Sequence, residues 1–403
     1  MSNPLFARQA IFNKDLQVHA YELLFRGDFP NTGEAFDGDK ASSHVLLYAF
    51  GERRIEDITG NKDAFINFTR NLLVCPPPLP ASQLVIEVLE DVVPDATLLK
   101  ALKELKSRGY RIALDDFLLT EHSKHLLPFA DLIKIDVLNM SEAELRAHMA
   151  ELKKENVKFI AEKIESHEMF KLCIELGFDY FQGYFLAKPQ IVQGTKAKQG
   201  TQSILQLLAK ITANNADFKS IAHILSNDPE LSFRLLKMVN SPAFGNGRQV
   251  ESLSQAIALA GLDRIRNWAI FLLMASNSHK PAELCVISST RAKFCEQLAF
   301  SSKACDPCQA FTVGLLSTLD AHMDMPMDKI LSQLNLAEDV CKALGEPPQG
   351  PLGLLLRTSK ALEQSAWSDI PLGSLAALGI GEQEISEAYA EAICFAEQTH
   401  KAL

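Results

Sequence analysis

The chain has 403 residues, enough for two or three domains, and its 47% hydrophobic and 22% charged residues are typical of a soluble globular protein. No hydrophobic run approaches the roughly 20 residues that cross a bilayer, and the N-terminus lacks a signal-peptide pattern, so we expect a cytoplasmic protein without a membrane partner. A formal net charge of −10 argues against direct binding to a nucleic-acid polymer.

The eight cysteines do not form a recognisable framework. Only Cys305 and Cys308 have the spacing of a metal or redox pair, and no second pair or nearby histidine completes a four-ligand site. We therefore expect ordinary cytosolic thiols.

The first half of the chain alternates strand-like and helix-like segments. Amphipathic helices are predicted at 95–108, 142–155 and 167–176, and two of them meet a glycine stop, at Gly109 and Gly177. The predicted strands cover residues 17–25, 64–67, 84–89, 111–114, 132–135, 158–160 and 180–181. This alternation predicts a mainly parallel sheet, open or closed.

The strand signal stops at a polar stretch rich in lysine, glycine and glutamine. From Ser203 onward, hydrophobic residues recur at helical spacing, beginning with Ile204, Leu207, Leu208 and Ile211. The predicted organisation is therefore an α/β domain over residues 1–192, a linker over 193–202 and an all-helical domain over 203–403.

Polar residues gather where the predicted strands end. Helix capping explains one or two of them, but not an oxygen-bearing residue at nearly every strand end. In a TIM-like (β/α) barrel these ends would meet at one face. Carboxylate and amide oxygens suit Mg²⁺ or Mn²⁺, so an acidic rim with one lysine suggests metal-assisted attack of water on a phosphodiester. The residues are Glu22, Asn67, Glu87, Asp115, Asp116, Lys134, Glu162, Glu165 and Gln182.

Over about residues 5–190 the sequence resembles the EAL domain, a bacterial family of cyclic di-GMP phosphodiesterases and receptors. The likeness rests on several motifs in the expected order. These are ELLFR at 22–26, Asn67 in INFT, Glu87 with Glu90, Asp115-Asp116-Phe117, Lys134-Ile135-Asp136, AEKIE at 161–165 and QGYFLAKP at 182–189.

The resemblance implies a role for each matched residue. Lys134 would orient the attacking water, and Glu162 would be the general base or a carboxylate linked to the metal. Arg26 would hold a ligand phosphate, Leu24 would belong to the same ligand-binding set, and Asp116 would hold a second ion. The first ion would be ligated by Glu22, Asn67, Glu87 and Asp115, with Glu165 and Gln182 supporting the site.

Three departures from the family pattern bear on activity. Leu23 replaces an alanine, and Lys163 replaces a glycine. The glycine-rich loop that follows the paired aspartates in active members is Leu118–Ser123 here, without glycine, and the span to Lys134 is about two residues shorter. In the family this loop shapes the second metal site and a dimer contact, so the expectations of a second ion and of a homodimer depend on it.

The second half resembles the HDOD domain, a degenerate relative of the HD and HD-GYP phosphohydrolases, over about residues 200–403. Where the parent superfamily would carry its His-Asp metal pair, this chain has Ser317-Thr318. We therefore expect this half to bind a protein partner rather than to catalyse a reaction. Lone histidines on helices are more often packing or surface residues, and Trp268 and Phe271 are expected in the core. The histidines concerned are His223, His279 and His322.

Three functions remain open from the sequence. The altered loop slightly favours a cyclic di-GMP receptor with weak or lost hydrolysis, signalling through the HDOD half. The complete set of ligand-type residues supports the alternative, an active phosphodiesterase that gives linear pGpG. A pure interaction scaffold ranks last, because unpaired buried carboxylates cost stability and would not be expected to persist without a ligand.

Overall fold

The computed structural model describes residues 5–25, 55–153, 156–189, 207–212, 229–240, 250, 255–256, 260–275, 280–302, 304–334 and 336–402. The chain divides into two compact units. One runs from Pro4 to Phe185 and includes the short segment Glu363–Ser365, and the other covers most of the chain from Leu186 onward. The predicted linker at 193–202 lies outside the described residues, so its bounds stay a prediction.

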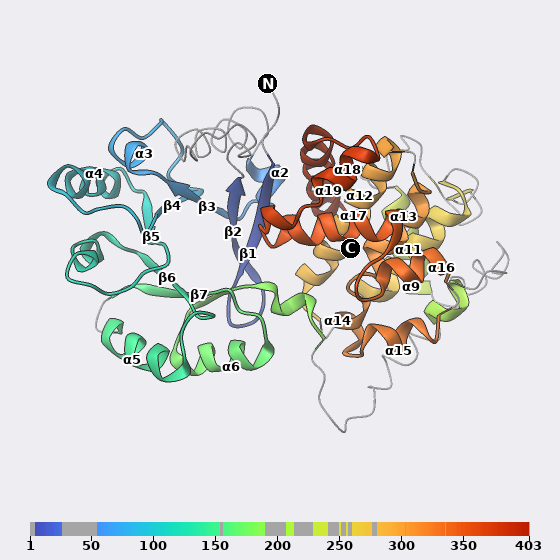
Figure 1. Cartoon of the computed structure of the whole chain (residues 1–403), viewed down its shortest axis with the longest axis horizontal. Helices are drawn as coiled ribbons and strands as arrows, with labels where there is room; N and C mark the ends of the chain where they lie inside the picture. The colour runs from blue at the N-terminus through green and yellow to red at the C-terminus, as the bar shows by residue number, and fades with distance from the viewer. Residues whose placement is uncertain are drawn as a thin grey trace. The chain divides into compact units, whose positions relative to one another are not determined.

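The first unit is a closed eight-stranded barrel (Figure 1). Strand β1 is antiparallel to both neighbours, β2 and β8, and every other neighbouring pair is parallel. The strands are β1 (Phe6–Phe12), β2 (Val18–Phe25), β3 (Asp63–Phe68), β4 (Leu84–Val88), β5 (Arg111–Leu114), β6 (Leu132–Asp136), β7 (Lys158–Glu162) and β8 (Tyr180–Gln182). The predicted TIM-like barrel is confirmed.

All seven predicted strands are present, but β1 was missed. It joins β2 without the intervening helix of a β/α unit, so it falls outside the repeating pattern on which the prediction relied. It also carries two polar residues in its centre. The side chain of Arg8 is buried and donates to the carbonyl of Ile58, and Gln9 is half-buried.

Helices α4 (Ala96–Ser107), α5 (Glu142–Leu152) and α6 (His167–Leu176) lie outside the strands, with short helices α2 (Ile55–Thr59) and α3 (Arg70–Val74) (Figure 1). Their ends follow local sequence signals. Asp95 caps α4 by accepting from the Leu98 amide at 2.8 Å, and Ser141 forms a capping box with Glu144 at α5. Helix α6 ends at Gly177, whose φ of 87° is left-handed, as the glycine predicts.

A layer of buried side chains fills the barrel beneath its C-terminal face. The layer takes one residue from each strand: Ile11, Ala20, Phe65, Val85, Ala113, Leu132, Ile160 and Tyr180. Because side chains alternate along a strand, the residue two places farther along also points into the barrel. The apolar layer therefore fixes which residues form the next layer at the C-terminal ends of the strands.

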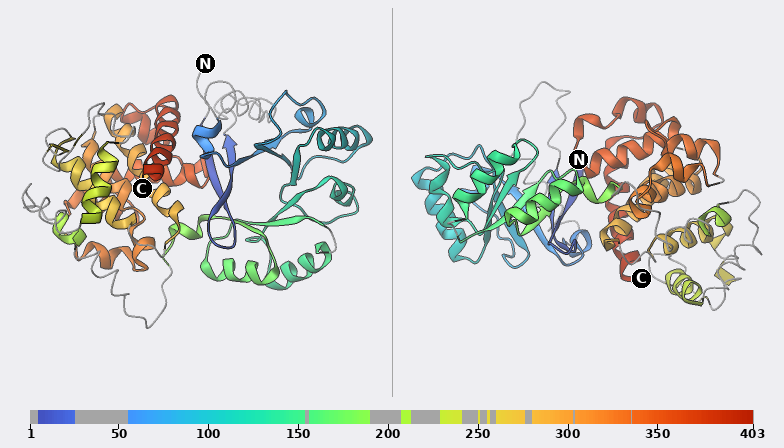
Figure 2. Two further views of the ribbon diagram at one scale, coloured as in Figure 1. Left: turned by 180° about the vertical axis from the view of Figure 1, so that it is seen from behind. Right: turned by 90° about the horizontal axis from the view of Figure 1, so that it is seen from below.

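The second unit contains helices and no strand among the residues that the structure describes (Figure 2). Helix α12 (Ala282–Ser302) packs against α13 (Pro307–Leu316) and α19 (Glu382–Ala402). The other helices are α9 (Pro229–Val239), α11 (Leu262–Ala275), α14 (Leu319–Met323), α15 (Met327–Leu331), α16 (Glu338–Leu344), α17 (Gly350–Glu363) and α18 (Leu372–Ala377).

Close contact between α12 and α13 depends on a glycine. A Cβ at Gly314 would lie 2.4 Å from the carbonyl oxygen of Arg291, so α13 could not pack this closely with a larger residue. Trp268 and Phe271 of α11 are buried, which confirms the predicted core assignment. His223 and His279 lie outside the described residues.

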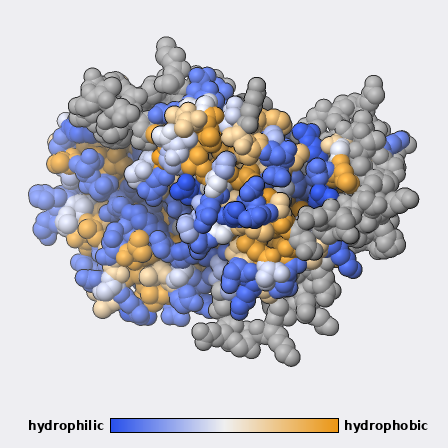
Figure 3. Space-filling view, turned by 45° about the vertical axis from the view of Figure 1, so that its right-hand side comes forward, coloured by the Kyte–Doolittle hydropathy of each residue, from blue (hydrophilic) through white to orange (hydrophobic). Residues whose placement is uncertain are grey.

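No described helix is long and apolar enough to cross a membrane. The face of the molecule in Figure 3 mixes hydrophilic and hydrophobic residues.

Candidate functional site

A polar layer lies directly above the apolar layer of the barrel. Each of seven predicted site residues follows a member of the apolar layer by two places: Glu22, Asn67, Glu87, Asp115, Lys134, Glu162 and Gln182. In antiparallel β1 the corresponding residue is Gln9, two places before Ile11 and paired with Glu22 in the strand register. We call these eight residues the polar ring; the alternation of the strands brings them to one end of the barrel.

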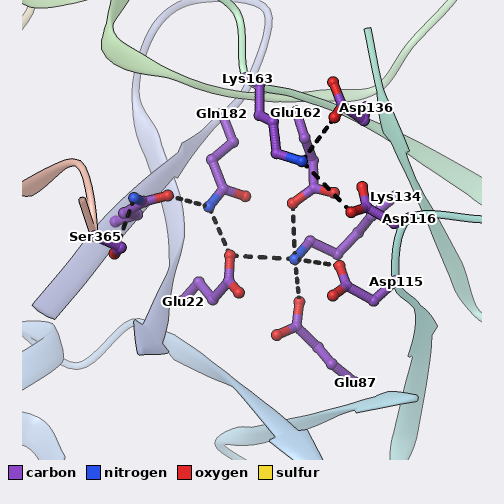
Figure 4. A network of polar contacts seen from close by, with 11 residues as sticks. Glu22, Glu87, Asp115, Asp116, Lys134, Asp136, Glu162, Lys163, Gln182 and Ser365 are labelled. Carbon is purple, nitrogen blue, oxygen red and sulfur yellow. Dashed lines mark hydrogen bonds and ion pairs between the residues drawn. The ribbon is translucent and has the colours of Figure 1, made fainter. Parts of the chain in front are cut away.

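Lys134 is at the centre of the polar ring (Figure 4). Its side chain is 1% exposed. Its Nζ lies 2.7 Å from Glu87 Oε1, 2.8 Å from Glu162 Oε1, 2.9 Å from Asp115 Oδ1 and 3.1 Å from Glu22 Oε2. An ammonium has only three protons, so these four carboxylates are held as much by charge as by hydrogen bonds.

The ring also contains amide contacts. The Nε2 atom of Gln182 donates to Glu22 Oε2 at 2.6 Å and to Gln9 Oε1 at 2.9 Å (Figure 4). Gln9 was not predicted as a site residue, because it lies on the strand that the sequence pattern did not reveal. The next residue after Gln182 is Gly183, where a Cβ would lie 2.2 Å from the carbonyl oxygen of Ile164. The glycine therefore lets the loops after β7 and β8 approach each other.

Burial and mutual repulsion change the proton affinities in the ring. Burial raises the pKa of Glu87 well above its usual value, and the neighbouring Glu22 carboxylate raises it further. Burial raises the pKa of Glu162 to about 8, against the lowering effect of Lys134. For Lys134 burial acts to lower the pKa, but the surrounding carboxylates, Glu162 first, raise it well above the usual value. Lys134 therefore remains charged, and burial favours the protonated form of Glu162.

Several ring oxygens lack donors. Asn67 Oδ1, Gln182 Oε1 and Glu87 Oε2 are buried and receive no hydrogen bond from the described residues, whereas Glu87 Oε1 faces the Lys134 ammonium at 2.7 Å. Buried oxygens without donors are costly unless a cation faces them, and an all-oxygen set suits a hard divalent ion. In the described chain, however, no three His, Cys, Asp or Glu side chains are grouped as a metal cluster; the carboxylates surround Lys134 instead.

Asp116 precedes the loop that differs from the family's glycine-rich loop, just beyond the polar ring. Its φ of 40° turns the chain away from β5, and its Oδ1 is buried without a hydrogen-bond partner in the described chain. The loop is then closed by its own side chains: Thr120 N donates to Ser123 Oγ at 2.8 Å, and Ser123 Oγ donates to the Leu118 carbonyl at 2.6 Å. The loop thus obtains its shape from local hydrogen bonds rather than from glycine.

Lys163 lies on the other side of Asp116 (Figure 4). Its Nζ is 2.6 Å from Asp136 Oδ2 and 3.4 Å from Asp116 Oδ2. The sequence showed that Lys163 departs from the family pattern, but it did not show these two contacts.

The remaining predicted ligand-binding residues lie outside the polar ring or outside the described residues. Leu24 is half-buried in β2, opposite Ala7 of β1. Glu165 follows the strand end on an exposed stretch rather than in the polar ring. Arg26 lies outside the described residues. Their assignments stay predictions.

In the helical unit, a packed polar cluster lies at the position where the parent superfamily would carry its metal pair. The Thr318 hydroxyl contacts Ser288 Oγ, which is 3.4 Å from His322 Nε2, and Arg291 donates to Ser317 Oγ at 3.1 Å. His322 is fully buried, and burial lowers its pKa to about 3. In this structure His322 is thus a neutral packing residue, as expected.

Fold and site together define a (β/α)-barrel protein with an acidic, lysine-centred site, joined to a helical unit. The EAL domain model matches residues 54–189, and the HDOD domain model matches residues 199–323. The chain is 33% identical over 400 residues to "Uncharacterized protein YuxH" of Bacillus subtilis, covering 96% of both chains. It is 32% identical to "Cyclic di-GMP phosphodiesterase CdgJ" of Vibrio cholerae, covering 96% of this chain and 90% of that protein. The protein belongs to the family that joins an EAL domain to an HDOD domain.

Solved structures with a similar fold include "PaMucR Phosphodiesterase, c-di-GMP complex", 20% identical over 45% of this chain and 94% of that one, with a TM-score of 0.37. Another is Klebsiella pneumoniae BlrP1 in a manganese and cyclic di-GMP complex, 23% identical over 45% of this chain and 55% of that one, also with a TM-score of 0.37.

Proposed function

We propose that this EAL–HDOD protein is a cyclic di-GMP signalling protein whose barrel binds the nucleotide with a divalent cation, while hydrolysis is weak or lost. The observation that carries the proposal is the polar ring, in which the residues of the EAL motifs converge around Lys134. Nucleotide binding by the barrel would be signalled to a protein partner through the HDOD half. That partner and the expected homodimer stay predictions.

The donor set supports one cation site. Glu22, Asn67, Glu87 and Asp115 would hold Mg²⁺ or Mn²⁺, and the Asn67 Oδ1 and Glu87 Oε2 atoms, which have no donor among the described residues, favour this assignment. When bound, the ion would polarise a phosphodiester oxygen and supply a more acidic water. Glu162 would accept a proton in its ionised form, which the neighbouring Lys134 ammonium favours. Lys134, fixed by four carboxylates, would position the attacking water.

Two features favour weak turnover. The loop after Asp116 is closed by the Thr120–Ser123 hydrogen bonds, and it lacks the glycines that would let it follow the family's path. In addition, Lys163 pairs with Asp116, the residue that would hold a second ion. Both changes affect transition-state contacts more than the first cation and the ligand phosphates.

An active phosphodiesterase that releases linear pGpG remains the second candidate. One observation favours it: the proton-accepting Glu162 and the charged Lys134 lie 2.8 Å apart inside an intact acidic ring. The name of the Vibrio cholerae relative, which covers nearly the same length, points the same way. A scaffold without a nucleotide ranks below both, because it gives no reason for so many buried acids.

Binding and turnover measured on one preparation separate these candidates. Calorimetry with cyclic di-GMP and Mn²⁺ should show saturable binding, while chromatography should show little pGpG under the same conditions. Asp115→Asn should weaken Mn²⁺ binding, whereas Asp91→Asn, at an exposed acid, should not. Fast release of pGpG would show that the protein is an active phosphodiesterase, and absence of nucleotide binding would favour a scaffold.

A further inference from the structure

Three neighbouring strand ends place one lysine between two aspartates. Asp116 follows β5, Asp136 ends β6 and Lys163 follows β7. Lys163 Nζ is 2.6 Å from Asp136 Oδ2 and 3.4 Å from Asp116 Oδ2 (Figure 4). This lysine is separate from Lys134, which neutralises the interior of the ring.

The backbone sets the direction of the Lys163 side chain. Its φ of 57° lies in the left-handed region, which side chains other than glycine rarely adopt. The strain is tolerated here, and the lysine forms two ion pairs from this conformation. An unfavourable backbone conformation beside a candidate site is a reason to look for a role for the side chain.

Asp136 anchors the lysine. Its Oδ1 accepts from the Leu138 amide at 2.9 Å, and its Oδ2 accepts from Asn139 Nδ2 at 2.6 Å as well as from Lys163. The carboxylate is only 11% exposed, so its partners hold it in one orientation. Asp136 therefore fixes the ammonium beside Asp116 and has little capacity left for a metal.

We infer that Lys163 is a tethered cation that replaces a second divalent ion beside Asp116, so that the barrel takes one such ion instead of two. This inference rests on the proposed function, because it assumes that the first ion binds in the polar ring. A divalent ion placed against Asp116 would meet one ammonium and two carboxylates, those of Asp116 and Asp136, whereas the polar ring offers four carboxylates around one ammonium. The smaller excess of negative charge beside Lys163 opposes binding of a second ion. The Oδ1 atom of Asp116, buried without a donor in the described chain, is one free oxygen, and a hard cation needs several.

The inference predicts the Mn²⁺ stoichiometry of the full-length protein. Free Mn²⁺ can be followed by electron paramagnetic resonance during titration with the metal alone, which requires no turnover. The wild-type protein should bind one ion per chain. Lys163→Gly, which suits the left-handed backbone, and Lys163→Met, which keeps the side-chain length, should each bind two.

Two control variants make the result specific. Lys158→Met removes an exposed lysine at the start of the same strand β7 and should leave one ion. Adding Asp116→Asn to Lys163→Gly should return the stoichiometry from two to one. Melting temperatures of all variants would show that they are folded before titration.

Each contrary outcome has a distinct meaning. Two ions on the wild-type protein, or one ion on both Lys163 variants, would overturn the inference and leave the proposed function standing. No ion on any of these proteins would overturn the inference, and it would also remove the metal from the proposed function. Titration with cyclic di-GMP would then decide whether nucleotide binding survives.

Discussion

The ammonium nitrogen of Lys134 lies 2.7 Å from Oε1 of Glu87, and these two side chains are 1% and 0% exposed. A buried pair of this kind adds little net stability over an apolar pair, because both charges lose their hydration. Removing one partner is different, since it leaves the other buried without compensation. Loss of Lys134 is therefore expected to lower the stability of the barrel, because the buried Glu87 would be left without its partner.

Replacing Lys134 with methionine should lower the free energy of unfolding by about 3 to 5 kcal/mol, since four carboxylates lose their common cation. Protonation of Glu87 and Glu162, whose pKa values are already raised, would moderate the loss. Urea unfolding gives the measurement. Lys103→Met is the control and should cost less than about 1 kcal/mol, as expected at an exposed lysine. Equal stability of the two variants would show that Lys134 does not organise the ring.

Rebuilding the loop should raise turnover. A glycine-rich replacement of residues 118–123, with the missing length restored, should increase kcat while changing nucleotide affinity little, since the polar ring beneath is unchanged. Combining it with Lys163→Gly should increase kcat further, because the second cation site would then be open. Asp116→Asn in the combined variant should abolish the gain. If the rebuilt loop leaves kcat unchanged even with Lys163→Gly, the loop is not what limits the reaction.

Acid should destabilise the helical unit through His322. Its pKa in the folded protein is about 3 against 6.5 for an unburied histidine, so the unfolded chain binds a proton that the folded chain cannot. This contribution is absent above pH 6.5 and grows as the pH falls toward 3, reaching about 2 kcal/mol of lost stability at pH 5. His322→Gln should flatten the pH dependence of unfolding between pH 7 and pH 5, whereas His125→Gln, at an exposed site, should not. An unchanged slope in His322→Gln would contradict the assignment.

All hydrolysis should come from the barrel. In the full-length protein, Glu162→Gln should reduce any measured formation of pGpG to the level of the blank, since Ser317 and Thr318 stand where a second metal centre would need ligands. Glu104→Gln, at an exposed acid on α4, is the matched control. Activity that persists in Glu162→Gln would place a phosphodiesterase centre outside the barrel.

Seven of the eight residues of the polar ring could be found from the sequence, because each stands near the C-terminal end of a predicted hydrophobic strand. Glu87 and Lys134 are flanked by apolar residues, which is unusual for a charged residue unless it is functional. Gln9 could not be found in the same way. Its strand runs antiparallel and is not followed by a helix, so it does not share the β/α spacing that linked the others.

The contacts of Lys163 could not be predicted because they depend on backbone geometry. A lysine in place of glycine indicates a changed loop, but its direction follows from a φ of 57° and from the orientation of Asp136. Conversely, Glu165 belongs to a recognisable motif, yet its side chain is exposed beyond the strand end. The spacing of the motifs therefore predicted where the strands end. It did not predict the conformations of the loops that follow, because loops are fixed by contacts between distant segments.

The central claim is that the barrel binds cyclic di-GMP but hydrolyses it poorly. The most direct test mixes the purified full-length protein with cyclic di-GMP and Mn²⁺, and follows bound nucleotide and pGpG in the same samples over time. We predict that bound cyclic di-GMP accumulates in proportion to the protein and persists, with pGpG appearing slowly. Complete conversion to pGpG before a stable complex can be detected, or no bound nucleotide at all, would contradict the claim.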